Sequence, residues 1–201
     1  RNGGSVERSL AETIQLISLA GLARTDFFSK AAFYGGTALR LIWGINRFSE
    51  DLDFSLLETD ASFELEQYFP AVNNELQSYG FTVQISKKAK SNIHIIKIGV
   101  PAEISSKYPQ NQVCKVKLEV DTQPPPMAGF DVAYIDDPAP FSLRTYDGPS
   151  LFAGKMDAVI SRSWHNRVKG RDWYDFAFFV RKEIPLSLTH LEARLRQKQY
   201  V

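Results

Sequence analysis

Residues Asp51–Leu56 alternate strictly between two kinds of side chain, which is the period of a β-strand with two different faces. Asp51, Asp53 and Ser55 share one face, and apolar side chains occupy the other. Carboxylates at positions i and i+2 of a strand project side by side. Such a pair can hold one or two Mg²⁺ ions, which prefer oxygen ligands and keep waters for substrate phosphates.

A glycine pair precedes this strand. Gly35 and Gly36 follow the short apolar stretch Ala31–Tyr34 and lead into a predicted helix, Thr37–Trp43. Paired glycines let the backbone approach a triphosphate closely, and the following helix offers N–H groups to the anion. The two motifs together predict a phosphate cradle that faces a metal clamp, as phosphoryl or nucleotidyl transfer requires.

A D-x-D motif alone is weak evidence, because it also marks sugar-nucleotide transferases and many surface turns. Its combination with the glycine pair and the helix favours the catalytic interpretation. A third carboxylate is expected from the strand-like segment Val113–Asp121, where Glu119 is the first choice and Asp121 the alternative. The same polar face can equally be a solvent-facing side whose charges compensate one another.

The remaining pattern predicts an α+β (mixed α/β) fold. A nucleotidyltransferase core with an N-terminal helix is expected over residues 1–148, and a helical C-terminal region, which we expect to continue beyond Val201, over 149–201. The expected helices are Glu7–Ala23, Ala61–Tyr79, Ser150–Arg162, Arg171–Lys182 and Leu188–Gln199, and the expected further strands are Phe81–Ser86, Ile93–Val100 and Phe141–Thr145.

Composition excludes several classes of protein. The net charge of +1 argues against bulk electrostatic binding to nucleic acid, so any RNA contact must come from a local patch. The single cysteine excludes an intramolecular disulfide and a cysteine-rich zinc site, and the three histidines lack metal-ligand spacing. No signal-peptide region or apolar run of membrane-spanning length is present, which predicts a cytoplasmic location.

Several charged residues late in the chain are further candidates. Lys155 lies in a predicted helix, and Asp172 and Asp175 open the next one, three residues apart. Lys155 can bind phosphate while Asp172 orients it or activates an acceptor hydroxyl. Alternatively, the aspartates cap the helix and compensate its dipole. Arg167 and Lys169 lie in a basic, aromatic stretch that can stack on a base or form a solvated connection.

Phe33–Leu41 together with Arg47–Phe54 resembles the signature of AbiEii/AbiGii-type toxin nucleotidyltransferases. Lys155 and the stretch Lys169–Asp175 resemble two later motifs of that family, and the match runs from about Leu10 to Phe179. The resemblance implies a polymerase-β-like nucleotidyltransferase core followed by helices. It departs from the family at Gly36, where related enzymes often have Ser.

The resemblance also implies roles for these residues. Asp51 and Asp53 would hold the metals, with Glu119 as the candidate third ligand, and Asp172 would act in catalysis beside Asp175. The residues that would bind the nucleotide are Gly35, Gly36, Thr37 and Lys155, and the nearby Arg40 and Arg47 are further triphosphate candidates.

The expected activity is Mg²⁺-dependent transfer of a nucleotide from an NTP to an acceptor, foremost the 3′ end of tRNA. The protein would be the toxin of a toxin–antitoxin or abortive phage infection system, encoded beside its antitoxin. Two alternatives remain: the acceptor is a protein or a small molecule, or the fold is catalytically silent and binds a partner.

Overall fold

The computed structural model describes residues 3–81, 84–90, 93–99, 115–161 and 170–199. The chain divides into two compact units. The first comprises Arg1–Pro124 with Val132–Arg144, and the second comprises Pro125–Asp131 with Thr145–Val201. Within the described ranges, no helix combines the length and the apolarity that crossing a bilayer requires.

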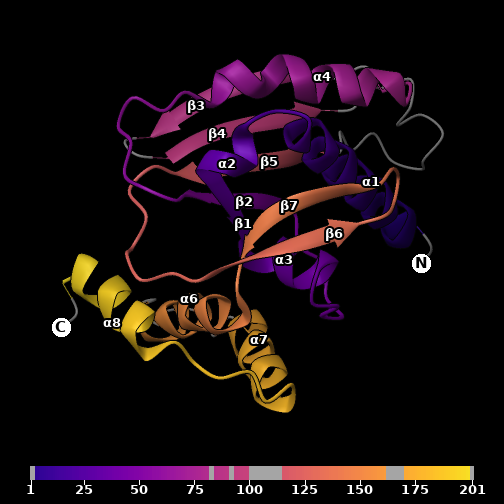
Figure 1. Ribbon diagram of the computed structural model, residues 1–201. Coiled ribbons are helices and arrows are strands. Elements are labelled where there is room, and N and C mark those ends of the chain that lie inside the picture. Colours follow the sequence, from indigo (N-terminus) through magenta and orange to yellow (C-terminus); the bar gives the residue numbers. More distant parts are fainter. Residues whose placement is uncertain (1–2, 82–83, 91–92, 100–114, 162–169, 200–201) are drawn as a thin grey trace. The chain divides into compact units, whose positions relative to one another are not determined.

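A mixed β-sheet dominates the first unit (Figure 1). Its strand order is β3-β4-β5-β2-β1-β7-β6. Strand β2 pairs with β5 in parallel and with β1 antiparallel, while β4 pairs antiparallel with both β3 and β5. The strands are β1 (Ala31–Tyr34), β2 (Asp51–Leu56), β3 (Gln84–Lys90), β4 (Ile93–Gly99), β5 (Lys115–Asp121), β6 (Phe130–Ile135) and β7 (Phe141–Tyr146).

The helices of this unit are α1 (Gly3–Ala23), α2 (Phe27–Lys30), α3 (Gly35–Leu41), a short 3₁₀ turn η1 (Leu65–Tyr68) and α4 (Phe69–Ser78). Helices α1 and α4 lie side by side (Figure 1). Their backbones come close at Gly21, where an added Cβ would lie 2.9 Å from Cα of Val72. A larger side chain at Gly21 would therefore push the two helices apart.

The hydrophobic core of the first unit explains why β2 is held rigidly. Leu52 and Phe54 on its apolar face are fully buried. The ring of Phe54 packs edge-on against Phe27 at a centroid distance of 4.9 Å. Because the side chains of a strand alternate, burying these two residues turns Asp51 and Asp53 to the opposite face.

The second unit contains the helices α6 (Gly148–Ser161), α7 (Gly170–Arg181) and α8 (Leu188–Gln197). Phe152 of α6 stacks on Phe179 of α7 with ring planes 3° apart and centroids 4.7 Å apart. Helix α8 begins with a side-chain cap, because the hydroxyl of Ser187 accepts a hydrogen bond from the backbone N–H of His190.

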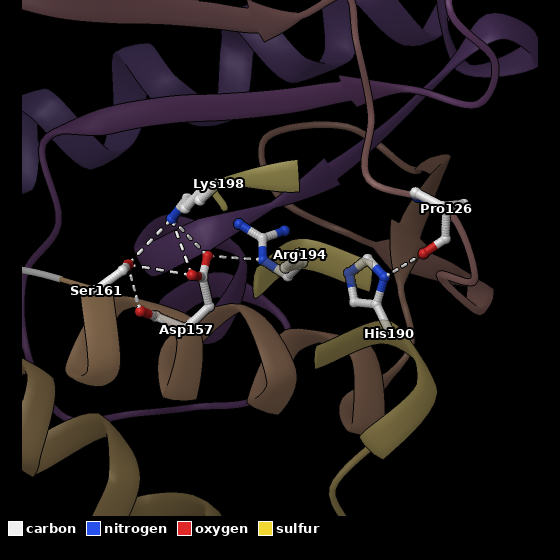
Figure 2. Close-up of polar contacts among 6 residues, drawn as sticks. All are labelled: Pro126, Asp157, Ser161, His190, Arg194 and Lys198. Carbon is white, nitrogen blue, oxygen red and sulfur yellow. Dashed lines mark hydrogen bonds and ion pairs between the residues drawn. The ribbon is translucent and has the colours of Figure 1, made fainter. Parts of the chain in front are cut away.

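Asp157 of α6 is almost completely buried within this unit, and two cations of the C-terminal segment neutralise it (Figure 2). Its Oδ2 atom lies 3.0 Å from Nε of Arg194 and 2.7 Å from Nζ of Lys198. Burial alone would raise the pKa of Asp157, but the hydrogen bond from Lys198 and the charge of Arg194 outweigh it and lower that pKa below its ordinary value. The ion pairs tie α8 and the residue after it to α6.

The structure departs from the predicted elements in several places. Helix α3 covers Gly35–Leu41 rather than Thr37–Trp43, and β3 covers Gln84–Lys90 rather than Phe81–Ser86. The expected helix Ala61–Tyr79 is wrong in its first part, because the chain forms η1 there and α4 begins only at Phe69, with Pro70 in its first turn. Strand β6 was not predicted. Its large side chains, such as Tyr134, are exposed, whereas the smaller Ala133 and Ile135 on its other face are partly buried against the core.

Candidate active site

The turn between β1 and α3 brings the first glycine of the motif against the second aspartate. Gly35 has a φ of +86°, which only glycine adopts readily. A Cβ atom at Gly35 would lie 2.3 Å from Oδ2 of Asp53. The strand register agrees, since Tyr34 pairs directly with Asp53. The glycine is therefore required both by its backbone conformation and by the carboxylate that lies over it.

Gly36 is covered by the loop that leads into β2. A Cβ at Gly36 would lie 2.6 Å from Oγ of Ser49 and 3.1 Å from one terminal guanidinium nitrogen of Arg47. The Ser49 hydroxyl and the Arg47 guanidinium thus occupy the space beside Gly36. The structure thus brings Arg47, a predicted candidate, to the glycine turn, together with Ser49, which was not predicted.

Asp51 and Asp53 are both partly exposed on one face of β2, as their alternation predicts. Thr37 is buried, and its hydroxyl donates a hydrogen bond to the backbone carbonyl of Asp51. This contact fixes the start of β2 against α3. The predicted contact of Thr37 with a triphosphate stays a prediction.

Strand β5 supplies the neighbours of the two aspartates. In the parallel register Lys117 lies beside Asp51 and Glu119 beside Asp53. The Glu119 carboxylate forms an ion pair with Lys117. Asp121 lies one step further along, beside Ser55, and accepts a hydrogen bond from the backbone N–H of Gln123 at 2.9 Å. The register therefore favours Glu119 over Asp121 as the third carboxylate, and its role as a metal ligand stays a prediction.

Arg40 of α3 is engaged with the N-terminal helix. Its Nε atom lies 2.7 Å from a carboxylate oxygen of Glu12, and both side chains are partly buried. The guanidinium also donates to the backbone carbonyl of Ile45 at 3.4 Å. In this arrangement Arg40 joins α1 to α3, and its proposed contact with a triphosphate is untested.

The second unit holds the other candidates. Nζ of Lys155 on α6 lies 2.9 Å from Oδ2 of Asp175 on α7, and the Asp175 side chain is only 1% exposed. Asp172, one turn earlier on α7, is also buried. The structure thus pairs Lys155 with Asp175. The role that the sequence interpretation gave to Asp172 stays a prediction. Arg167 and Lys169 lie outside the described residues.

A family model described as "Nucleotidyl transferase AbiEii toxin, Type IV TA system" matches residues 17–200. The chain belongs to this family. The AbiEii chain is therefore a nucleotidyltransferase and a member of a toxin family of type IV toxin–antitoxin systems, as the signature around Gly35 and Asp51 indicated. No curated protein matches it.

Solved structures support the fold of this chain. One is a candidate nucleotidyltransferase from H. pylori, with 22% identity, a TM-score of 0.61, and coverage of 93% of this chain and 74% of that one. Another is JHP933 from Helicobacter pylori, with 21% identity, a TM-score of 0.61, and coverage of 95% and 73%. The predicted mixed α/β nucleotidyltransferase fold is confirmed.

The donor chemistry of the AbiEii site suits Mg²⁺. Asp51 and Asp53 offer adjacent carboxylates, and Mg²⁺ is commonly bound by one or two carboxylates together with waters and substrate phosphates. In the part of the chain that the structure describes, no group of three or more His, Cys, Asp or Glu side chains could hold a metal ion. The candidate metal ligands on the described residues are therefore the two carboxylates of β2, Asp51 and Asp53, with the role of Glu119 a prediction.

Residues of α1 that support this site were not predicted. Gln15 is fully buried and donates hydrogen bonds to the carbonyls of Ser49 and Glu50. The only sequence signal is a polar residue within a helix that is mostly apolar around it, from Ile14 to Leu22. Such a residue is a candidate for a buried polar contact, although its partner cannot be deduced from helical periodicity.

Proposed function

We propose that the protein transfers a nucleotide from an NTP to the 3′-hydroxyl of an RNA, foremost tRNA, in a reaction that requires Mg²⁺. The observation that carries this proposal is the contact between the glycine turn and the D-x-D strand, in which Gly35 lies directly beneath Asp53. A phosphate-binding turn and two adjacent carboxylates are needed within one small region for this chemistry. Family membership supports the reaction class.

The residues of the first unit bind and orient the donor. Asp51 and Asp53 would hold Mg²⁺, which when bound neutralises phosphate charge and polarises the phosphoryl oxygens. The backbone of Gly35 and Gly36 lets the triphosphate approach closely, and Arg47 beside Gly36 supplies a positive charge to it. Arg40, which Glu12 holds at the end of α3, would contribute a second positive charge.

In the transfer step, the acceptor oxygen forms a bond to the α-phosphorus of the NTP. The bond between the α-phosphorus and its bridging oxygen to the β-phosphate breaks, and pyrophosphate leaves. The hydroxyl proton is lost to water as the new bond forms. For the second unit, the family resemblance supports a role of Asp172 in catalysis and of Lys155 in binding the nucleotide. Asp175 keeps Lys155 oriented, since their 2.9 Å ion pair fixes the ammonium group.

The biological role proposed for this reaction is growth arrest. A toxin that adds nucleotides to the 3′ end of tRNA blocks aminoacylation, because the amino acid is attached at that end. A type IV system implies a cognate antitoxin that counteracts the toxin. Release of the toxin during phage infection would make this an abortive infection system.

The test is incubation of the purified protein with Mg²⁺, each labelled NTP in turn and total bacterial tRNA. Asp53→Ala should abolish label transfer while leaving the fold intact. Glu58→Ala removes an exposed carboxylate shortly after β2 and serves as the matched control, with transfer expected at the wild-type rate. Circular dichroism of all three proteins verifies the fold.

Label in the tRNA band with the wild type and Glu58→Ala, but not with Asp53→Ala, supports the proposal. Normal transfer by a folded Asp53→Ala protein contradicts the assignment of the site. In a cell lysate, label that resists RNase but yields to protease would identify a protein acceptor and overturn the tRNA proposal. A folded wild type that binds no Mg²⁺–NTP in calorimetry would overturn the activity itself.

A further inference from the structure

Three consecutive backbone carbonyls at the entrance to β2 are each held by a side chain of another element. Nε2 of Gln15 donates to the carbonyls of Ser49 and Glu50, at 2.9 and 3.0 Å. The hydroxyl of Thr37 donates to the next carbonyl, that of Asp51. Since a carbonyl oxygen can only accept, the donor assignment of the Gln15 amide is settled by its partners.

This short stretch of backbone carries the charged groups of the candidate site. Ser49 and Arg47 lie over Gly36, and the Asp51 carboxylate follows directly. A change in the backbone at residues 49–51 would therefore displace the D-x-D pair and the groups over the glycine turn together. Arg47 and Ser49 precede β2, so the strand ladder does not hold them in place.

Gln15 is an unusual residue for a purely structural contact. Its side chain is fully buried in α1, and its Oε1 atom has no hydrogen-bond partner among the described residues. An unsatisfied buried oxygen costs stability, whereas an apolar side chain of the same size would not carry that cost. The amide is thus explained by its two donated hydrogen bonds rather than by packing.

A second residue of the same helix acts on the neighbouring element. Glu12, three positions before Gln15 and on the same side of α1, forms the 2.7 Å ion pair with Arg40 of α3. Helix α1 therefore contacts α3, which contains Gly35 and Gly36, through Glu12. Through Gln15 it contacts the loop before β2, which lies over Gly36. Both contacts lie within the first unit.

We propose that Gln15 is a positioning residue of the active site, which fixes the backbone at residues 49–51 so that Asp51 and Arg47 are presented correctly to Mg²⁺ and the triphosphate. This inference rests on the proposed function of Asp51 and Asp53. It assigns to the N-terminal helix a catalytic contribution in addition to its place in the core.

The test replaces Gln15 with Met, which has nearly the same length and no N–H donor. Ser18→Ala is the matched control, because Ser18 is also buried in α1 and, among the described residues, bonds only to the carbonyl of Ile14 in its own helix. Steady-state rates are measured against the concentrations of NTP and Mg²⁺. Hydrogen–deuterium exchange of the peptide spanning residues 49–53 provides a readout independent of activity.

We expect Gln15→Met to lower kcat roughly 10- to 100-fold, as small displacements of catalytic groups commonly do, and to raise the Mg²⁺ concentration needed for half-maximal rate. Exchange at residues 49–53 should accelerate in Gln15→Met and stay unchanged in Ser18→Ala. Gln15→Glu, which keeps the length but places oxygen against both carbonyls, should show the same loss.

Rates and exchange in Gln15→Met equal to those of Ser18→Ala would overturn the inference. So would failure of both Gln15 variants to fold, since Gln15 would then be a residue of stability alone. A wild type without transferase activity would refute the proposed function and this inference together, whereas an active wild type with unaffected Gln15 variants would refute this inference only.

Discussion

The aspartates of the two units lie in different electrostatic settings. Asp157 is buried in the second unit and has two cations and the hydroxyl of Ser161 within hydrogen-bonding distance. Asp51 and Asp53 are partly exposed on a strand face in the first unit. Because Gly35 has no side chain, there is space for the Asp53 carboxylate next to it. A carboxylate whose charge the protein already neutralises stabilises the fold, whereas one that keeps access to solvent can bind a cation from outside.

The same contrast applies to the arginines. Arg194 is directed at the buried Asp157, so its charge serves the packing of α8 against α6. Arg47 lies over Gly36, and a side chain at position 36 would enter the space that the Arg47 guanidinium occupies. Charge alone does not separate these two arginines; their neighbours do.

Asp51→Asn is the substitution with the largest expected effect. It removes one charge from the D-x-D pair and should lower transferase activity roughly 1,000-fold if Asp51 binds Mg²⁺ as proposed, since losing a metal ligand costs several kcal/mol of transition-state stabilisation. The free energy of unfolding should change by less than about 0.5 kcal/mol, because the side chain is partly exposed. Parallel rate measurements and denaturant titrations check this, and a large loss of stability would place Asp51 in the same class as Asp157.

Asp157→Ala should show the reverse pattern. Removing the buried carboxylate leaves Arg194 and Lys198 without their shared partner, and breaking a buried ion pair in this way costs about 3 kcal/mol. Transferase activity per folded molecule should stay within about two-fold of wild type, since Asp157, Arg194 and Lys198 are not proposed to bind substrate. The midpoint of urea unfolding measures the first effect; an unchanged midpoint would contradict the structural role of the cluster.

Gly35→Ala separates the two reasons for glycine at the turn. Gly44 also has a positive φ, +74°, but an added Cβ there meets nothing within 4 Å. Gly44→Ala should therefore cost only the backbone term, about 1 kcal/mol. Gly35→Ala should cost more and should also reduce activity, because its Cβ would displace the Asp53 carboxylate. Equal effects of the two variants in thermal unfolding and rate assays would show that the contact with Asp53 is unimportant.

The local part of the site was predictable from sequence because its signals are local. The alternation of Asp51–Leu56 and the glycine pair each occupy a few residues. Strand β2 covers the residues that its alternation predicts, whereas α3 begins at Gly35 itself rather than at Thr37. Gln15 was not predictable in the same way. Its partners are 34 and 35 residues away, in a loop without periodicity, so only the folded chain shows the contact.

The errors in the fold also have physical reasons. The start of α4 carried a signal that the interpretation did not use, since proline is favoured in the first turn of a helix and Pro70 lies there. Strand β6 also carried a signal that the interpretation did not use, since Phe130, Val132 and Tyr134 recur at every second position. The structure leaves these three side chains exposed, so the alternation does not mark a buried face.

The smallest expected effect concerns the pH dependence of the second unit. His190 is fully buried, its Nδ1 lies 2.8 Å from the carbonyl of Pro126, and its Nε2 has no partner among the described residues (Figure 2). Burial lowers the pKa of His190 below its ordinary value of 6.5, and Arg194 lowers it further. The carbonyl of Pro126 and the carboxylates of Asp147 and Asp157 act in the opposite direction without reversing the shift.

The sign of the effect follows from proton binding. Below pH 6.5 the unfolded chain protonates this histidine before the folded one does, so the free energy of unfolding is unaffected above pH 6.5 and falls as the pH drops toward the folded pKa. His190→Gln keeps a donor for the Pro126 carbonyl but does not titrate. The urea midpoint of the wild type should therefore decrease more between pH 7.5 and pH 5.5 than that of His190→Gln. Parallel decreases in both proteins would mean that His190 binds its proton equally well in the folded and unfolded chains. The buried His190 would then be as open to water as the partly exposed Asp51 and Asp53.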